Sequence, residues 1–174
     1  MVADLSFPIG RYVEPDVITP ELREPAIEVI EALPARIREA VHGLSETQLD
    51  TPYRPGGWTV RQLVHHIADS HMNAYLRLKL ALTEHNPTIK PYDQELSAAS
   101  ADSLLPVEES LSLLDGLHSR WTALWRSLTP EQFSRTFDHP EIGRVVLDGH
   151  LQIYAWHSRH HVAHITAMRK RVNI

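Results

Sequence analysis

The sequence of 174 residues contains no cysteine. This absence excludes a disulfide framework, a thiolate nucleophile and a thiolate metal ligand. Any metal ion that the chain binds must therefore take nitrogen or oxygen donors from the protein. Histidine is the residue type to follow, because the chain has 12 histidines in a composition that is otherwise ordinary for a globular protein.

The sequence also lacks long apolar runs and an excess of basic residues. No apolar stretch approaches the roughly 18 residues that a membrane span requires, so we expect no insertion into a membrane. The formal net charge is −5 with both signs interspersed, which gives no basic surface for nucleic acid. The first residues, MVADLSFPIG, lack the features of a secretory signal, and we therefore expect a cytoplasmic protein.

Helical signals dominate the chain, whose length fits a single domain spanning residues 1–174. Pro25 and Pro34 should kink the first predicted helix or divide it into shorter pieces. Thr59 and Gln62 form a capping box, which predicts the start of the second helix. The sequence predicts an all-α four-helix bundle. Its predicted helices are residues 20–42, 60–82, 107–128 and 148–171.

Three shorter segments carry local signals of their own. Residues 44–50 and 128–134 each have a hydroxyl residue followed three positions later by glutamine, and each should begin a short helical turn. Residues 135–147 contain His-Pro-Glu-Ile-Gly between β-prone flanks. This pattern predicts a small β-hairpin before the last helix.

Four of the histidines fall between positions 157 and 164, inside the last predicted helix. Residues spaced alternately by three and four lie on one face of a helix. Leu151 and Ile165 flank that face, which should therefore point into the bundle. A buried imidazole needs a hydrogen-bond partner or a metal, since an unsatisfied polar group costs about 1–3 kcal/mol. The stripe consists of His150, Tyr154, His157, His161, His164 and Met168.

His157 and His161 have the i, i+4 separation that lets two imidazoles on adjacent turns reach one ion. A third ligand must come from another helix, and the segment RQLVHHIADSH is the other dense histidine stretch. His66 is the better choice there, because its helix face carries the polar residues Gln62, Ser70 and Asn73. His65 shares a face with Asp69 and Met72 and could be an outer partner of the site or a surface residue.

Two established metal motifs do not fit the sequence. Di-iron carboxylate bundles need two Glu-x-x-His motifs, and the chain has one such spacing, Glu39 with His42. The zincin motif needs glutamate directly after its first histidine, whereas Ser158 follows His157. From the residues alone, the open alternatives are a three-histidine metal site, an interior polar network of neutral imidazoles, and a pH-sensitive interface.

The runs GGWTVRQLVHHIADSHMNAYLRLKLALTEHNPTIKPYD and YAWHSRHHVAHI resemble the DinB-like superfamily, and the resemblance extends over nearly the whole chain. They are most similar to its YfiT-type members, which are described as metal-dependent hydrolases and are related to bacillithiol S-transferases. The resemblance implies a four-helix bundle with one metal on three histidines. Its first ligand lies eight residues after Trp58, at His66, and its last two match His157 and His161.

One departure from the family pattern leaves a second ligand set open. Many relatives have a glycine-glutamine pair shortly after the last ligand, where this chain has Ala163 and His164. A pairing of His160 with His164 in place of His157 with His161 is therefore a geometric alternative. Trp58 also fits the family pattern, but we expect it to be a packing anchor outside the site.

Three protein nitrogens leave positions open for water or substrate, which is typical of catalytic metal sites. The resemblance implies a metal-dependent hydrolase that activates water, or a thiol S-transferase that conjugates a low-molecular-weight thiol to an electrophile. A non-catalytic metal-binding bundle is the third alternative. We expect zinc, with nickel as the alternative ion, a small-molecule substrate, and a homodimer. His164 should act as a proton shuttle or as a hydrogen-bond partner of a ligand, and residues 85–106 should overhang the site.

Overall fold

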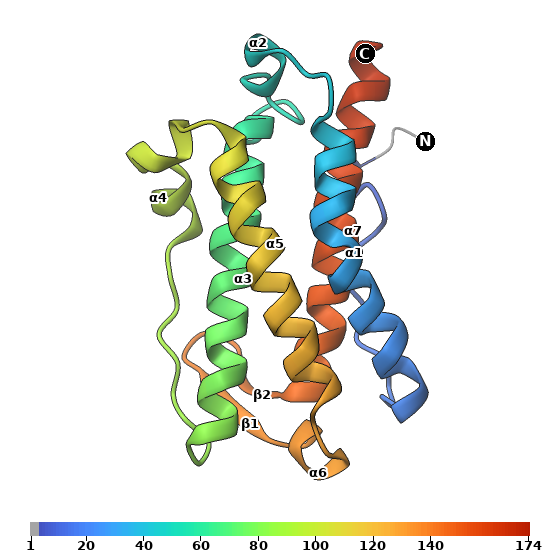
Figure 1. Cartoon of the computed structure of the whole chain (residues 1–174), viewed down its shortest axis with the longest axis vertical. Helices are drawn as coiled ribbons and strands as arrows, with labels where there is room; N and C mark the ends of the chain where they lie inside the picture. The colour runs from blue at the N-terminus through green and yellow to red at the C-terminus, as the bar shows by residue number, and fades with distance from the viewer. Residues whose placement is uncertain (1–3) are drawn as a thin grey trace.

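A computed structural model describes residues 4–174, and it is a four-helix bundle (Figure 1). Helix α1 packs against α5 and α7, and α3 packs against the same two helices. Helices α1 and α3 therefore occupy opposite corners of the bundle although they follow one another in the chain. The long helices are α1 (Arg23–Val41), α3 (Val60–Thr83), α5 (Val107–Arg126) and α7 (Leu147–Val172).

The long helices do not alternate in direction along the chain. In Figure 1, α1 and α7 run upward, whereas α3 and α5 run downward. This order requires a connection that returns along the full length of the bundle between α3 and α5 (Figure 1). The connection contains two short helices that the sequence analysis did not predict, α4 (Gln94–Ala98) and η2 (Ala101–Leu104).

The structure confirms the two short helices and the hairpin that were predicted between the long helices. Helices α2 (Glu46–Leu49) and α6 (Pro130–Phe133) both begin at capping boxes in which the hydroxyl accepts from the glutamine backbone N–H. The predicted hairpin consists of β1 (Thr136–His139) and β2 (Gly143–Val146), which pair antiparallel. The hairpin leads directly into α7, which begins one residue after β2 ends.

Of the two effects expected from the prolines, a kink or a division, the division is wrong, because α1 is one continuous helix from Arg23 to Val41. A 3-10 turn, η1 (Pro20–Leu22), precedes it. Pro25 falls in the first turn of α1, where backbone N–H groups have no partner within the helix in any case. Pro34 lies inside the helix and has no N–H to donate to the carbonyl of Ile30. That carbonyl instead accepts a hydrogen bond from His118 of α5, at 2.6 Å.

The interior holds two apolar clusters, one toward each end of the bundle. The first cluster includes Ile37, Leu63 and Leu114, and the second includes Trp121 and Leu151. Two fully buried histidines, His71 of α3 and His118 of α5, lie along their helices between these clusters. Such a layer of imidazoles must satisfy its own hydrogen bonds, because water has little access to it.

No helix among residues 4–174 is both long and apolar enough to cross a membrane. This finding agrees with the hydropathy pattern of the sequence.

Replacing Thr59 by alanine is expected to lower the free energy of unfolding by about 1 kcal/mol, because the hydroxyl caps the backbone N–H of Gln62 at the start of α3. Urea denaturation measures the change. Thr83→Ala, at the other end of the same helix, is the control, since its exposed hydroxyl bonds only carbonyls of its own last turn. Equal losses in the two variants would contradict a capping role for Thr59.

Candidate metal centre

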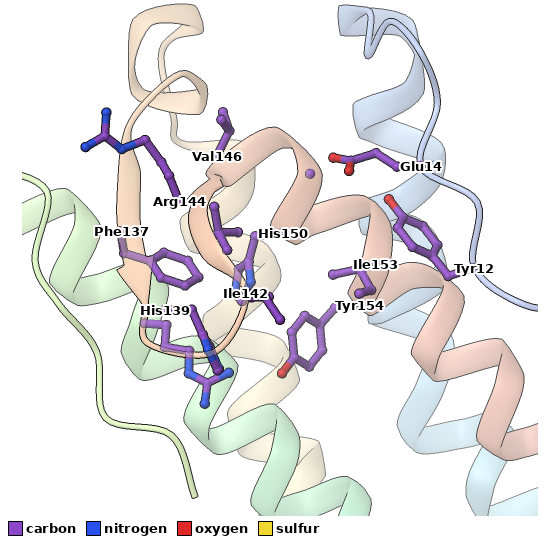
Figure 2. A pocket seen from close by; sticks show the side chains of 13 residues that line it. Tyr12, Glu14, Phe137, His139, Ile142, Arg144, Val146, His150, Ile153 and Tyr154 are labelled. Atoms are coloured by element: carbon purple, nitrogen blue, oxygen red, sulfur yellow. The ribbon is translucent and has the colours of Figure 1, made fainter.

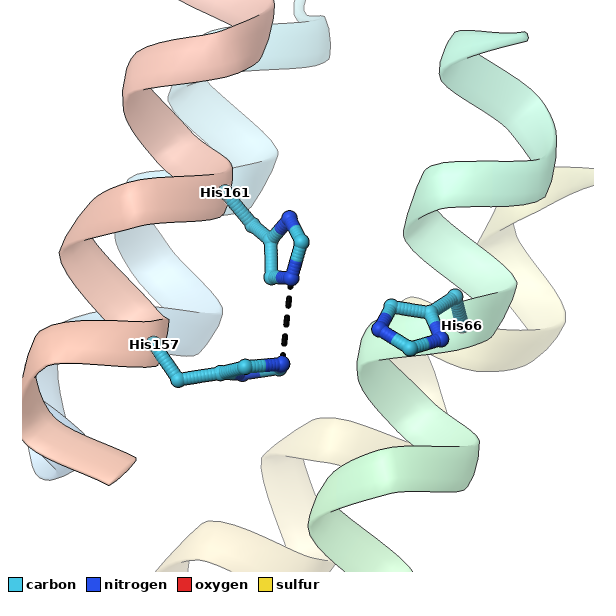
Figure 3. Close-up of side chains that lie close together, drawn as sticks. All are labelled: His66, His157 and His161. Atoms are coloured by element: carbon cyan, nitrogen blue, oxygen red, sulfur yellow. Dashed lines mark hydrogen bonds between the residues drawn. The ribbon is translucent and has the colours of Figure 1, made fainter. Parts of the chain in front are cut away.

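His66, His157 and His161 lie together between two neighbouring helices that run in opposite directions. His66 projects from α3, and the other two project from successive turns of α7 (Figure 3). One ring nitrogen from each residue lies within 4.8 Å of the other two. The Nε2 atoms of His157 and His161 are 3.0 Å apart. The i, i+4 spacing on α7 produces this pairing, and the packing of α3 against α7 adds the third imidazole.

These rings border a cavity of about 370 Å³ that opens to solvent. Trp58 packs against the first apolar cluster, as expected of a packing anchor, and it also lines this cavity, with its ring centroid 4.6 Å from that of His66. Glu95 of α4 also lines the cavity and accepts a hydrogen bond from Trp58 Nε1 at 3.0 Å. The connection between α3 and α5 thus reaches the site, as expected, and covers it through α4.

Burial keeps the three imidazoles neutral. It lowers the pKa of His66 to about 4. Burial also holds the pKa values of His157 and His161 well below the ordinary value, and neighbouring histidines lower them further. Neutral imidazole is the form that binds a metal ion. At neutral pH each ring therefore has one lone pair to offer without first losing a proton.

Hydrogen bonds leave lone pairs of His66 and His161 free. No hydrogen bond joins His66 to another described residue, so neither of its nitrogens is committed elsewhere. His161 contacts His164 through the two Nδ1 atoms, at 3.4 Å, and Nε2 of His164 faces the Ser6 carbonyl at 3.3 Å. Because a carbonyl only accepts, His164 donates from Nε2 and accepts from Nδ1–H of His161. Nε2 of His161 then carries the lone pair.

The donor set fits a divalent ion that is intermediate between hard and soft in its preference for ligands. All three donors are imidazole nitrogens, which suit zinc, nickel, copper and iron better than calcium or magnesium. Three protein donors are one fewer than a closed tetrahedral site requires, and the cavity lies on the open side. The residues present therefore match an ion with at least one exchangeable position.

A second group of three imidazoles overlaps the first. Ring nitrogens of His160, His161 and His164 also lie within 4.8 Å of one another, which makes this group a second candidate ligand set. It keeps His161 and lacks His66, so it differs from the expected alternative, in which His160 and His164 join His66. All three come from α7, and His160 stacks on Trp156 with centroids 4.3 Å apart. Nδ1 of His160 is buried without a partner among the described residues.

His65 is buried but takes no part in either group. Its Nδ1 contacts the Ser110 hydroxyl at 2.7 Å, and its Nε2 donates toward the Leu105 carbonyl at 3.0 Å. These contacts tie α3 to the start of α5, so His65 has a packing role. Sequence reasoning missed two buried histidines behind the site: His71 contacts His157 directly, and His118 contacts His71. His118 is the one histidine of α5, and no pattern in the sequence relates it to the others.

A second cavity, of about 400 Å³, lies at the hairpin end of the bundle (Figure 2). Figure 2 shows Phe137, His139 and Ile142 entering it from the hairpin, and Tyr12 and Glu14 from the N-terminal segment. Neither of the two groups of potential metal ligands found among the described residues lies there. We therefore place the candidate site in the histidine cavity.

Comparisons with known proteins agree with this fold. A protein of Bacillus mycoides named "putative metal-dependent hydrolase" is 54% identical over 170 residues, which cover 98% of each chain. A Bacillus cereus protein of the same name is 55% identical over the same coverage. The structure of YfiT from Bacillus subtilis, described as a probable metal-dependent hydrolase with an unusual four-helix bundle topology, superposes with a TM-score of 0.95 at 49% identity, covering 98% of both chains. The DinB superfamily model matches residues 30–165, and the chain belongs to this superfamily.

Proposed function

We propose that this protein is a metal-dependent hydrolase in which His66, His157 and His161 hold one zinc ion, with nickel as the alternative. The observation that carries the proposal is the convergence of three neutral imidazoles on one wall of an open cavity. The names of the Bacillus relatives support the same class of activity. A divalent ion held there would act as a Lewis acid and lower the pKa of a water molecule.

The chain's own residues would hold and cover the reacting groups. The cavity volume of about 370 Å³ suits a small molecule. Arg54 lines it and contributes a guanidinium, which favours a substrate or transition state that carries negative charge. Trp58 and Glu95 line the cavity beside His66 and are joined by a hydrogen bond. A site built in this way selects small substrates with an electron-poor carbonyl or similar centre.

We assign His164 to the support of His161. Its two nitrogens are engaged by His161 and by the Ser6 carbonyl, and Tyr53 packs on its ring with centroids 4.2 Å apart. An imidazole held from both sides orients its neighbour. Proton transfer by His164 would first require release of one of these contacts, so orientation is the better supported of the two expected roles.

The proposal predicts hydrolysis that depends on the metal. Zinc-loaded protein is assayed against small esters, amides and phosphate esters, and chelation should abolish the turnover of any substrate found. His66→Ala should lower kcat/KM by more than about a hundredfold, because a metal that polarises the reacting centre supplies several kcal/mol. His65→Ala is the matched control, since it removes an equally buried neighbouring histidine that does not face the cavity.

The same assay separates hydrolysis from thiol transfer. Each reaction is repeated with a low-molecular-weight thiol and an electrophilic acceptor in place of the hydrolysable substrate. Zinc-loaded protein that hydrolyses no substrate and conjugates the thiol would replace the hydrolase proposal by a metal-dependent S-transferase. Hydrolysis that survives both chelation and His66→Ala would contradict a role for the metal.

A further inference from the structure

A chain of hydrogen-bonded imidazoles crosses the bundle behind the candidate ligand His157. Nδ1 of His157 lies 3.0 Å from Nε2 of His71, and Nδ1 of His71 lies 3.0 Å from Nε2 of His118. Nδ1 of His118 lies 2.6 Å from the carbonyl oxygen of Ile30. Each of the four long helices contributes one member, in the order α7, α3, α5 and α1.

The two inner rings of the imidazole chain are buried. His71 is 0% exposed and His118 is 1% exposed. Trp121 packs edge-on against both rings, with centroids 5.4 and 5.6 Å away, and Tyr154 packs edge-on against His71. Water therefore has little access to His71 and His118, and their ring nitrogens must find partners within the protein.

The Ile30 carbonyl, at one end of the imidazole chain, determines the direction of every hydrogen bond in that chain. The Ile30 carbonyl can only accept, so His118 donates from Nδ1 and has its lone pair on Nε2. His71 must then donate from Nδ1 to His118 and accept at Nε2. His157 must in turn donate from Nδ1 to His71, which leaves its own lone pair on Nε2.

Pro34 explains why a carbonyl in the middle of α1 is free for this purpose. Its ring nitrogen has no hydrogen, so the Ile30 carbonyl has no partner four residues later in its own helix. His118 is the donor that satisfies it. The proline that does not divide α1 thus provides the acceptor at the end of the imidazole chain.

We propose that His71 and His118 are positioning residues that fix the tautomer and orientation of His157, so that its Nε2 lone pair faces the metal position. This inference rests on the proposed role of His157 as a ligand. Nε2 of His161 carries a lone pair for the separate reason given above, and the two Nε2 atoms are 3.0 Å apart. Two lone pairs at that separation repel each other, and a cation that both can bind removes the repulsion.

Zinc affinity, measured by competition with a chromophoric chelator, tests the proposal through variants of His71. His71→Leu removes the acceptor for His157 and should weaken zinc binding by about 10–100-fold. His71→Gln should retain near-normal affinity, because its amide oxygen can accept from His157 and its amide nitrogen can donate to His118. His150→Leu is the matched control: His150 is as buried, sits on α7 and bonds only the Ala74 carbonyl, so its loss should leave zinc affinity unchanged.

Wild-type affinity in His71→Leu would overturn the proposal, as would equal losses in His71→Leu and His71→Gln. The tautomers are also read directly, without any variant, from long-range ¹H–¹⁵N correlation spectra of the histidine rings. The proposal requires Nδ1–H in His157, His71 and His118, with or without zinc, and a proton on Nε2 of His157 would overturn it. Failure of the wild type to bind zinc would contradict the proposed function, whereas normal zinc binding with the wrong tautomer would contradict this inference alone.

Discussion

Replacing His157 by alanine is expected to weaken zinc binding by more than about a hundredfold, beyond the 10–100-fold typical of residues that only support a ligand. The physical reason is the loss of one of three nitrogen donors together with the end of the imidazole chain that orients it. Elemental analysis of protein purified without an affinity tag measures the metal per chain, and wild-type protein should contain nearly one equivalent. His66→Ala should behave in the same way.

His160→Ala distinguishes the two overlapping groups of imidazoles. His160 belongs only to the group that lies wholly on α7, so this variant should keep its metal if His66, His157 and His161 are the ligands. Retention of metal in His157→Ala with its loss in His160→Ala would assign the ion to His160, His161 and His164. A wild type that stays free of metal after dialysis against zinc would contradict both sets.

The second large effect is expected from acid. Burial lowers the pKa values of His118 and His150 to about 4, while each is about 6.5 when the chain is unfolded. Below pH 6.5 these two imidazoles therefore bind protons in the unfolded chain but remain neutral in the folded protein. Stability from these two groups is complete above pH 6.5 and is lost as the pH falls toward 4. The loss is on the order of 3 kcal/mol for each, against a typical total of about 5–15 kcal/mol.

Urea unfolding of metal-free protein at a series of pH values measures this dependence. The free energy of unfolding should fall by roughly 1.4 kcal/mol per pH unit for each buried histidine near pH 5, and far-ultraviolet circular dichroism should show cooperative unfolding in acid. His118→Gln and His150→Gln each remove one such group. Each variant should therefore reduce the slope of unfolding free energy against pH by the contribution of one histidine, roughly 1.4 kcal/mol per pH unit. A flat profile between pH 6.5 and 4 would show that the interior histidines titrate in the folded protein as they do in the unfolded chain.

Much of the fold could be predicted from local patterns. The capping box at Thr59 gave the first residue of α3 correctly, because the hydroxyl and the glutamine three residues later satisfy each other within one turn. The two short capped helices were predicted for the same reason, and the hairpin was predicted from a turn motif between β-prone flanks. The division of α1 at its prolines was wrong, because Pro25 falls in the first turn and a neighbouring helix satisfies the carbonyl that Pro34 leaves free.

The candidate site, too, could be predicted only where it depends on local patterns. The spacing of His157 and His161 is a property of one helix, so their proximity could be predicted from the letters alone. The position of Trp58 over His66 could not, since a turn residue's direction depends on what packs against it. Helices α4 and η2 were also missed, although a local signal for α4 was present, since the side chain of Asp93 caps the backbone N–H groups of Glu95 and Leu96.

Local patterns were sufficient to place α3, α5 and α7 to within about two residues at each end and to identify the inward face of α7, because these features depend on neighbours within one or two turns. The absence of cysteine was sufficient to exclude a thiolate ligand from any metal site. Long-range packing was needed to place His71 and His118 behind His157 and the Ile30 carbonyl at the end of their chain. Those partners are 47, 86 and 88 positions apart along the sequence. Their contact follows from the packing of four helices, which sets hydrogen-bond directions that no local pattern contains.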